Sequence, residues 1–509
     1  MQTTDRLSPR LCNLAVLTAC IACISMPATS ATSAPPVFKR EAWLQDYASL
    51  KTQLEQRYSH LAWFGSPQSG VNLPALERRT RRALKSAENG VDARAALVDF
   101  IAGFHDGHLK VVPTRQAGSH QPAPPAVQFD KLSAAQACAA LGYTLHEMVT
   151  FSAPFESLRD YALRSDGITH PFRAGVVQSA QGRRIGIIRI PSFRENDTPP
   201  DACIREWNRA SSSKEVVSLA TIRANIDAAW FQSMAAQLKQ FQADGVAAVL
   251  VDVGTNPGGG DSGDWASRLF TPGDVHSARL LISAEPLASK YLDEELRSLQ
   301  QGLDRHPEAS AETKQTLENA IRTLKQRKAD LGTRKTDMSW VWRTQRPWNP
   351  ASDNRLINVG YASGQIDYLP VGALGGTQLA SRMYWAAEVD HLRGAWSGPV
   401  YVLTDNKTAS SAEMFAAVMR DNGIAKTIGD TTLGAGAGSM FSAPEIVLPY
   451  SGMHIKFPNA VRLRGDGSDE VAGIKPDLPV LPMQDEPGRN RAARIVEAIA
   501  ADLPQAAQP

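Results

Sequence analysis

The chain has 509 residues, of which 43% are hydrophobic and 21% charged, an ordinary composition for a globular protein. At roughly 150 residues per domain, this length predicts about three structural units with a sizeable core. Lys and Arg number 54 and Asp and Glu number 52, so the formal net charge is only +2. That balance gives no support to a nucleic-acid or other polyanionic partner.

The first residues have the features of an export signal. Arg6 and Arg10 precede an apolar stretch, 11–26, and the small residues after it suit removal of a signal peptide, 1–31. The stretch is too short for a comfortable transmembrane helix. Within it, "LTAC" also resembles a lipobox, which would leave a lipid anchor at Cys20. Both interpretations predict an exported protein, periplasmic or extracellular. In the second, the lipid at Cys20 anchors the protein to a membrane.

Cleavage near residue 31 leaves two cysteines, Cys138 and Cys203. In an oxidising compartment they could form one disulfide, and two buried free thiols are the alternative. Their spacing matches no metal site. The sequence predicts no metal and no other cofactor, and it does not indicate an oligomeric state.

The first predicted unit along the chain is a helical bundle, 38–112. Its apolar residues, among them Trp43, Tyr47 and Leu50, recur at three- and four-residue intervals. A proline-rich stretch follows. After it, 126–180 is a mixed region in which neither the helical nor the strand period dominates.

An α/β core is predicted next, because apolar strands alternate with helices. "VAAVLVDV" (246–253) and "PVYVLT" (399–404) are strands of the kind that is buried on both faces. Amphipathic helices are expected at 221–243 and 411–421, each followed by a glycine. The core therefore consists of two segments, 181–285 and 395–482.

A helical insert, 286–340, separates the two core segments, and its charged periodic stretches predict a helical hairpin. It carries none of the motifs described below, so we expect the functional site not to depend on it. The residues after the core, 486–509, are predicted to form a C-terminal tail.

Three short segments contain residues suited to catalysis. Ser410 lies where a strand passes into a helix, beside free N–H groups of the helix start, and a simple helix N-cap is the alternative. His108 follows a glycine turn and could act as a general base, whereas a surface histidine, as for His105, is the alternative. Glu470 lies in a turn-rich segment, where an exposed carboxylate is usually just solvated.

Together with "DVGTNPGG" (252–259), these segments resemble the C-terminal-processing, or tail-specific, serine peptidase family. Its other motifs are matched, in order, by "TASSAE", "GDTTLGAG" and "EVAGIKPD". The resemblance covers about 38–482 and implies a mixed α/β (α+β) fold with a crotonase-like serine peptidase core. Two features differ from the family pattern. Ala435 replaces the usual lysine base, and 126–180 has no recognisable signature of the family's PDZ module.

The lysine-less pattern resembles the tricorn-protease-like branch of the family, in which a histidine serves as base. The resemblance implies that Ser410 is the nucleophile, His108 the base and Glu470 the carboxylate that orients the base. It also implies an oxyanion hole in which the N–H of Gly258 or Gly259 acts beside that of Ser411.

"GDSG" (260–263) is the tetrapeptide that surrounds the nucleophile of trypsin-like proteases, but the residue after it is Asp264 rather than glycine. Ser262 is therefore predicted to be a loop residue. The sequence as a whole predicts an exported serine endopeptidase, or carboxyl-terminal processing peptidase, that acts on a peptide or protein substrate. An esterase using the same serine and a catalytically silent relative that binds peptides or hydrophobic ligands are the alternatives, the latter motivated by the missing lysine.

Overall fold

The computed structural model describes residues 38–504, except for 114–131, 144–148, 169, 195–199, 213–218, 285, 332–335, 351–352, 371–372, 376 and 441–443. The predicted signal peptide and the candidate lipid anchor at Cys20 lie outside the described residues. Within the described residues, no helix combines the length and apolar character needed to cross a membrane. Residues Arg40–Pro509 form one compact unit.

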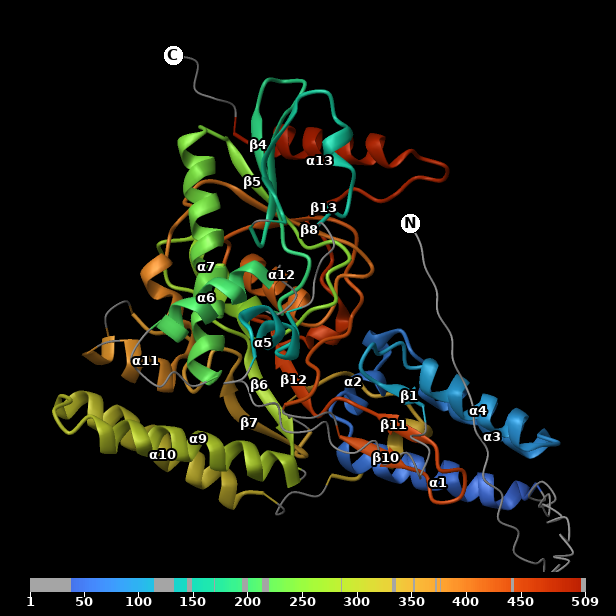
Figure 1. Ribbon diagram of the computed structural model, residues 1–509. Coiled ribbons are helices and arrows are strands. Elements are labelled where there is room, and N and C mark those ends of the chain that lie inside the picture. Colours follow the sequence, from blue (N-terminus) through green and yellow to red (C-terminus); the bar gives the residue numbers. More distant parts are fainter. Residues whose placement is uncertain are drawn as a thin grey trace, which may run out of the picture. The chain divides into compact units, whose positions relative to one another are not determined.

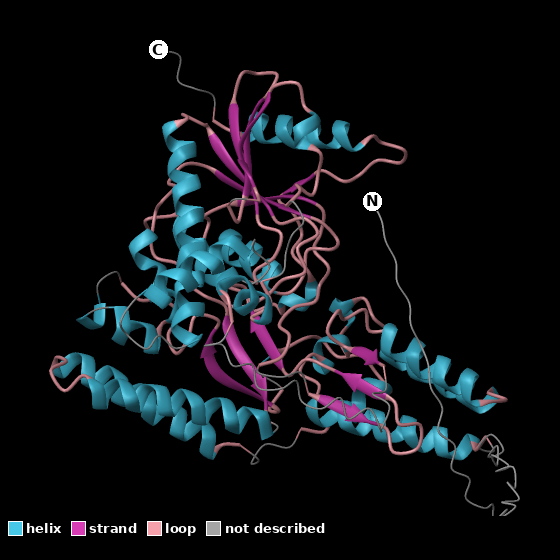
Figure 2. Ribbon diagram, in the orientation of Figure 1, coloured by secondary structure: helices cyan, strands magenta, loops and turns pink. Residues whose placement is uncertain are grey.

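A seven-stranded mixed sheet is the centre of the core (Figures 1 and 2). Its five strands at one side run parallel, and the last two pairings are antiparallel. In spatial order the strands are β13 (Leu478–Pro479), β9 (Lys426–Gly429), β8 (Val400–Thr404), β5 (Ala248–Asp252), β4 (Arg184–Arg189), β3 (Arg173–Gln178) and β2 (Tyr161–Asp166). The region 126–180 therefore supplies two strands of the core sheet rather than a separate module.

Helices cover both faces of this sheet, as expected for strands that are apolar throughout (Figure 1). On β5, Val249 and Val251 face the helices α7 (Leu219–Ala243) and α12 (Ser411–Asp421). Their neighbour Leu250 faces α13 (Gly488–Asp502) on the other side. The predicted helices in the core are thus confirmed, but the segment expected as a tail, 486–509, contains a helix that buries one face of the sheet.

The N-terminal bundle consists of α1 (Arg40–Arg57), α2 (Leu61–Phe64), α3 (Leu73–Ser86) and α4 (Gly90–Ala102). It ends in a strand that the helical pattern did not predict, β1 (Lys110–Val112). This strand pairs with β11 (His454–Lys456), which also pairs with β10 (Glu445–Val447). The bundle and the C-terminal part of the core therefore share a sheet.

The insert forms the expected helical hairpin, α9 (Pro286–Arg305) and α10 (Ala311–Ala329). The hairpin packs on a second three-stranded sheet, in the order β12 (Ala460–Leu463), β6 (Arg279–Ser283) and β7 (Leu356–Tyr361). Its apolar cluster includes Leu292 and Leu317 of the hairpin and also Ala437, which follows the glycine-rich 429–436 motif. The insert thus packs directly against the end of a motif loop and is closer to the candidate site than the sequence suggested.

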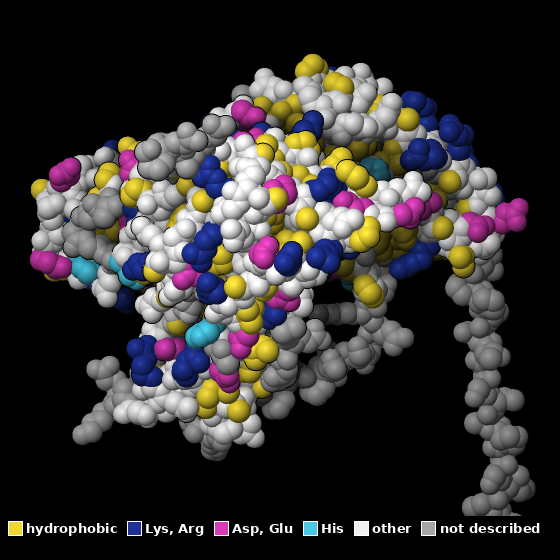
Figure 3. All heavy atoms as spheres, turned by 90° about the horizontal axis from the view of Figure 1, so that it is seen from above, with side chains coloured by type: hydrophobic (Ala, Val, Ile, Leu, Met, Phe, Trp, Pro, Cys, Tyr) yellow, Lys and Arg dark blue, Asp and Glu magenta, His cyan; other side chains and the backbone are white. Residues whose placement is uncertain are grey.

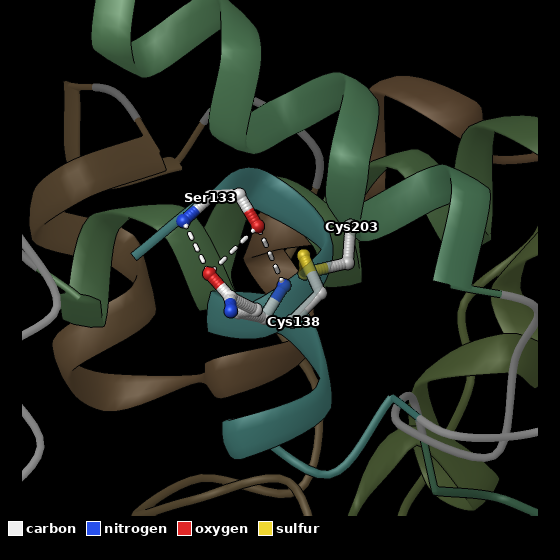
Figure 4. The surroundings of a disulfide bond; sticks show 4 residues. Ser133, Cys138 and Cys203 are labelled. Atoms are coloured by element: carbon white, nitrogen blue, oxygen red, sulfur yellow. Dashed lines mark hydrogen bonds between the residues drawn. A yellow bond between two sulfur atoms is a disulfide. The ribbon is translucent and has the colours of Figure 1, made fainter. Parts of the chain in front are cut away.

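Cys138 and Cys203 form a disulfide (Figure 4). The bond joins α5 (Ala134–Ala140) to α6 (Pro200–Ser212) inside a buried apolar cluster. Of the two alternatives left open by the sequence, the structure has the cross-link. On the face shown in Figure 3, basic and acidic side chains are interspersed, in agreement with the small net charge.

Candidate active site

Two loops meet at one edge of the central sheet because β5 and β8 are parallel neighbours, with Asp252 opposite Leu403. The carboxyl ends of parallel strands lie at the same edge, and the loops that leave them there form the usual binding crevice of such sheets. The loop after β5 carries Asn256 and the glycines, and the loop after β8 carries Ser410. A hydrogen bond from Ala409 N–H to the Asn256 carbonyl, 2.9 Å, joins the two loops.

Ser410 has a backbone conformation that is rare for a residue with a side chain. It occupies the N-cap position of α12 with φ 55° and ψ −117°, and it is half-buried. Gly258 lies against it, since a Cβ on Gly258 would approach Ser410 Cβ to 2.7 Å and Ser411 N to 2.8 Å. Gly258 also has φ 93°, so both its conformation and its contact with Ser410 require glycine.

The backbone conformation of Ser410 is held by the buried carboxylate of Glu413. Ser410 N–H donates to Glu413 Oε2 at 2.7 Å, and Ala435 N–H donates to the same oxygen at 3.0 Å. Three more donors reach this carboxylate from Thr432 Oγ1, Gly434 N and Gly436 N. Burial raises the pKa of Glu413, and these hydrogen bonds oppose that rise. One carboxylate thus fixes the serine turn and the 429–436 loop to each other.

The three predicted oxyanion-hole residues differ in the state of their N–H groups. Gly258 N–H already donates to the side chain of Asn256, at 2.8 Å. The N–H groups of Gly259 and Ser411 have no hydrogen-bond partner among the described residues, and Gly259 is exposed. The N–H of Gly258 is therefore already hydrogen-bonded to Asn256. Gly258 lets the loop approach Ser410 closely but has no free donor for an oxyanion.

His108 is oriented by the loop that normally carries the family's lysine. Its Nδ1 lies 2.9 Å from the carbonyl oxygen of Ala435. Because a carbonyl only accepts, Nδ1 carries the proton of the neutral ring and Nε2 keeps its lone pair. Burial lowers the pKa of His108, which favours this neutral form, while Asp106 opposes the shift. Nearby His105 is exposed and has φ 59°.

Glu470 is fully buried but is not bonded to His108. Its Oε2 accepts from Arg462 Nε at 2.7 Å, and its Oε1 has no hydrogen-bond partner within the described residues. Burial raises the pKa of Glu470 to about 7, and Arg462 limits that rise. Of the two routes by which Glu470 could orient His108, directly or through water, the direct hydrogen bond is absent from this structure.

Ser262 is a buried residue whose hydroxyl is hydrogen-bonded within the fold. It begins the short helix α8 (Ser262–Trp265) rather than lying in a loop, and it is buried. Its hydroxyl donates to the Phe193 carbonyl at 3.1 Å, so that hydroxyl is engaged in packing the glycine-rich loop on the sheet. Within the described residues, no group of three or more His, Cys, Asp and Glu side chains could hold a metal ion.

A buried ion pair that the sequence analysis missed lies beside these residues. His60 Nδ1 is 2.7 Å from Asp469 Oδ2, and His60 Nε2 is 3.2 Å from the Ala437 carbonyl. Because both ring nitrogens face acceptors, the imidazole is protonated. Burial alone would lower the pKa of His60, but the carboxylate of Asp469 outweighs this effect and the pKa is raised to about 9. His60 follows α1, so this pair fastens the bundle to the segment that contains Glu470.

This ion pair predicts a specific pH dependence of stability. The pKa of His60 rises from 6.5 to about 9 on folding, so its contribution is complete below about pH 6.5 and is lost as the pH rises through 9. The shift corresponds to roughly 3 kcal/mol. Urea unfolding is measured at about pH 6 and at about pH 10. Between these pH values, the unfolding free energy of the wild type should fall by roughly 3 kcal/mol more than that of His60→Gln. His306→Gln, in the insert, is the control and should follow the wild type. Equal losses in wild type and His60→Gln would contradict the assignment.

Comparison with known proteins finds a family that matches part of the chain. Residues 377–480 match the family described as Peptidase family S41. This part of the chain is therefore similar to peptidases of family S41. The matched segment contains Ser410, Ala435 and Glu470, and the prediction of a serine peptidase is confirmed. No curated protein gives a significant match to the chain.

Several solved structures resemble the chain over most of its length. A serine-to-alanine mutant of CPAF is 15% identical, with a TM-score of 0.52 and coverage of 91% of this chain and 98% of that one. Mature CPAF complexed with lactacystin is 16% identical, with coverage of 91% and 99% and a TM-score of 0.49. The photosystem II D1 C-terminal processing protease is 11% identical, with coverage of 88% and 95% and a TM-score of 0.31. The predicted mixed α/β fold is confirmed.

Proposed function

We propose that this serine peptidase cleaves peptide bonds with Ser410 as nucleophile and His108 as general base, in the manner of the lysine-less, tricorn-like branch. The observation that carries the proposal is the shared anchor at Glu413. Its Oε2 accepts from Ser410 N, which fixes the nucleophile, and from Ala435 N, whose own carbonyl orients His108. The nucleophile and the base are therefore both linked to one buried carboxylate, and such fixed positioning favours proton transfer between them.

In the proposed reaction, His108 Nε2 takes the proton of the Ser410 hydroxyl as its oxygen attacks the scissile carbonyl. The N–H groups of Gly259 and Ser411 stabilise the negative oxygen of the tetrahedral intermediate. The imidazolium then returns the proton to the leaving amine. Water, activated by the same base, hydrolyses the acyl-enzyme and releases the carboxylic acid product.

A fluorophosphonate probe tests this proposal. The probe phosphonylates activated serines, so the adduct is expected on Ser410 and not on Ser262, as located by mass spectrometry of the digested protein. The labelled protein should also lose peptide hydrolysis in proportion to labelling. Absence of labelling and of hydrolysis would favour the second candidate, a silent relative that binds peptides. The observation that motivates this candidate is Ala435 at the lysine position.

We also propose that the protein is exported and acts in the periplasm or outside the cell. The basic residues and apolar stretch at the N-terminus support export, and so does the Cys138–Cys203 disulfide, which persists in oxidising compartments. The intact mass of the same labelled sample shows at which residue the mature protein begins. A start near residue 31 indicates a cleaved signal peptide, a lipidated Cys20 indicates a membrane anchor, and an unprocessed Met1 contradicts export.

A further inference from the structure

Arg462 lies on β12 and joins three segments of the site. Its Nε donates to Glu470 Oε2 at 2.7 Å, and its Nη2 lies 3.2 Å from the Ser410 carbonyl and 3.3 Å from the Gly436 carbonyl. The side chain is largely buried, with 11% of its area exposed. The planar guanidinium suits such a fixed set of acceptors, because its donors point in set directions.

The position of this cation requires an explanation. It bonds the carbonyl of the N-cap residue of α12, and a positive charge near a helix N-terminus opposes the helix dipole. The ion pair with Glu470 balances that charge, while the Glu470 carboxylate gains its one hydrogen-bond donor among the described residues. Arg462 and Glu470 therefore depend on each other in this environment.

We propose that Arg462 is a positioning residue of the peptidase site, and that Glu470 acts on the site through Arg462 rather than by a direct bond to His108. The inference rests on the proposed roles of Ser410 and His108. Arg462 fixes the serine turn relative to the loop at Gly436, whose neighbour Ala435 holds the base. Its positive charge also disfavours the protonated form of the base.

The charged groups around His108 define the second role. Asp106, from the turn of His108 itself, favours the imidazolium, whereas His60 and Arg462, from two other elements, disfavour it. Arg462 thus helps to keep the base neutral. Removal of its charge raises the pKa of His108, so the base becomes protonated at a higher pH and activity is lost earlier as the pH falls.

The test compares Arg462→Met with Arg462→Lys. The methionine variant loses the charge and all three contacts, and we expect kcat/KM to fall by roughly 10- to 100-fold with the acid limb of its pH profile moved to higher pH. The lysine variant keeps the charge, so its acid limb stays at the wild-type position while part of the rate is lost. Arg420→Met, at the far end of α12, is the control and should match the wild type in both measurements.

An NMR titration of the His108 ring, assigned with His108→Gln, separates this inference from the proposed function. If the wild type is inactive and unlabelled but the pKa of His108 still rises in Arg462→Met, the proposed function fails and the electrostatic link stands. If the wild type is active and Arg462→Met has an unchanged kcat/KM, acid limb and His108 pKa, Arg462 has no positioning role. Should the methionine variant not fold, the lysine variant decides: a wild-type rate, or an acid limb moved to higher pH, likewise contradicts the positioning role.

Discussion

Replacing Ser410 by alanine is expected to reduce kcat for peptide hydrolysis by on the order of 10⁶-fold, the scale known for loss of a triad serine. Alanine keeps the Cβ that touches Gly258 and keeps the N–H that donates to Glu413, so the turn persists and only the nucleophilic oxygen is lost. The measurement is the initial rate of cleavage of a peptide library, with circular dichroism and urea unfolding to confirm a native fold.

Ser262→Ala is the matched control, because it removes a second serine hydroxyl, at the start of the short helix α8. That hydroxyl only donates to the Phe193 carbonyl, so we expect turnover within a few-fold of wild type and a stability loss of about 1 kcal/mol. The nucleophile assignment is wrong if Ser410→Ala keeps most of the turnover, or if Ser262→Ala is the variant that loses it.

The elements around Ser410 could be predicted from sequence because their signals are local. An apolar run of strand length predicted β8, and the periodicity of 411–421 with its following glycine predicted α12 at the bounds observed. The placement of Ser410 at the strand–helix junction followed from these two elements. The helix α13 was missed because 486–509 lies beyond the last motif. Its apolar face packs on the central sheet, and this contact is seen only in the tertiary structure.

The partners that hold the site could not be predicted, because each pairs residues that are distant in sequence. His60 and Asp469 are joined across 409 positions, and neither stands in a motif that specifies the other. Arg462 lies on a short strand, β12, where an arginine is usually solvated. The resemblance made Glu470 the carboxylate that orients His108. In the structure, the partner of Glu470 is decided by its burial and by the nearby guanidinium of Arg462, and both depend on tertiary structure.

His60 is buried and His108 is half-buried, and both bond to carbonyls of the 435–437 segment, but the structure distinguishes their chemical roles. His60 has an acceptor at each ring nitrogen and a pKa raised to about 9, so near neutral pH it is already protonated and cannot accept the Ser410 proton. His108 has a lowered pKa and, among the described residues, hydrogen-bonds only through Nδ1, so Nε2 is available as a base. The two histidines are therefore expected to respond differently to substitution.

His108→Ala is expected to lower kcat/KM by about 10²- to 10⁴-fold at neutral pH, because general-base assistance is lost while Ser410 and the oxyanion donors remain. In the wild type, activity should fall as the pH drops through the pKa of His108, which lies below its usual value near 6.5, since protonation removes the base. The residual activity of His108→Ala should lack this acid limb and rise with hydroxide concentration. His105→Ala, on the exposed neighbour, is the matched control and should keep both the rate and the limb. A wild-type rate in His108→Ala, measured on folded protein, would require the base to be sought elsewhere.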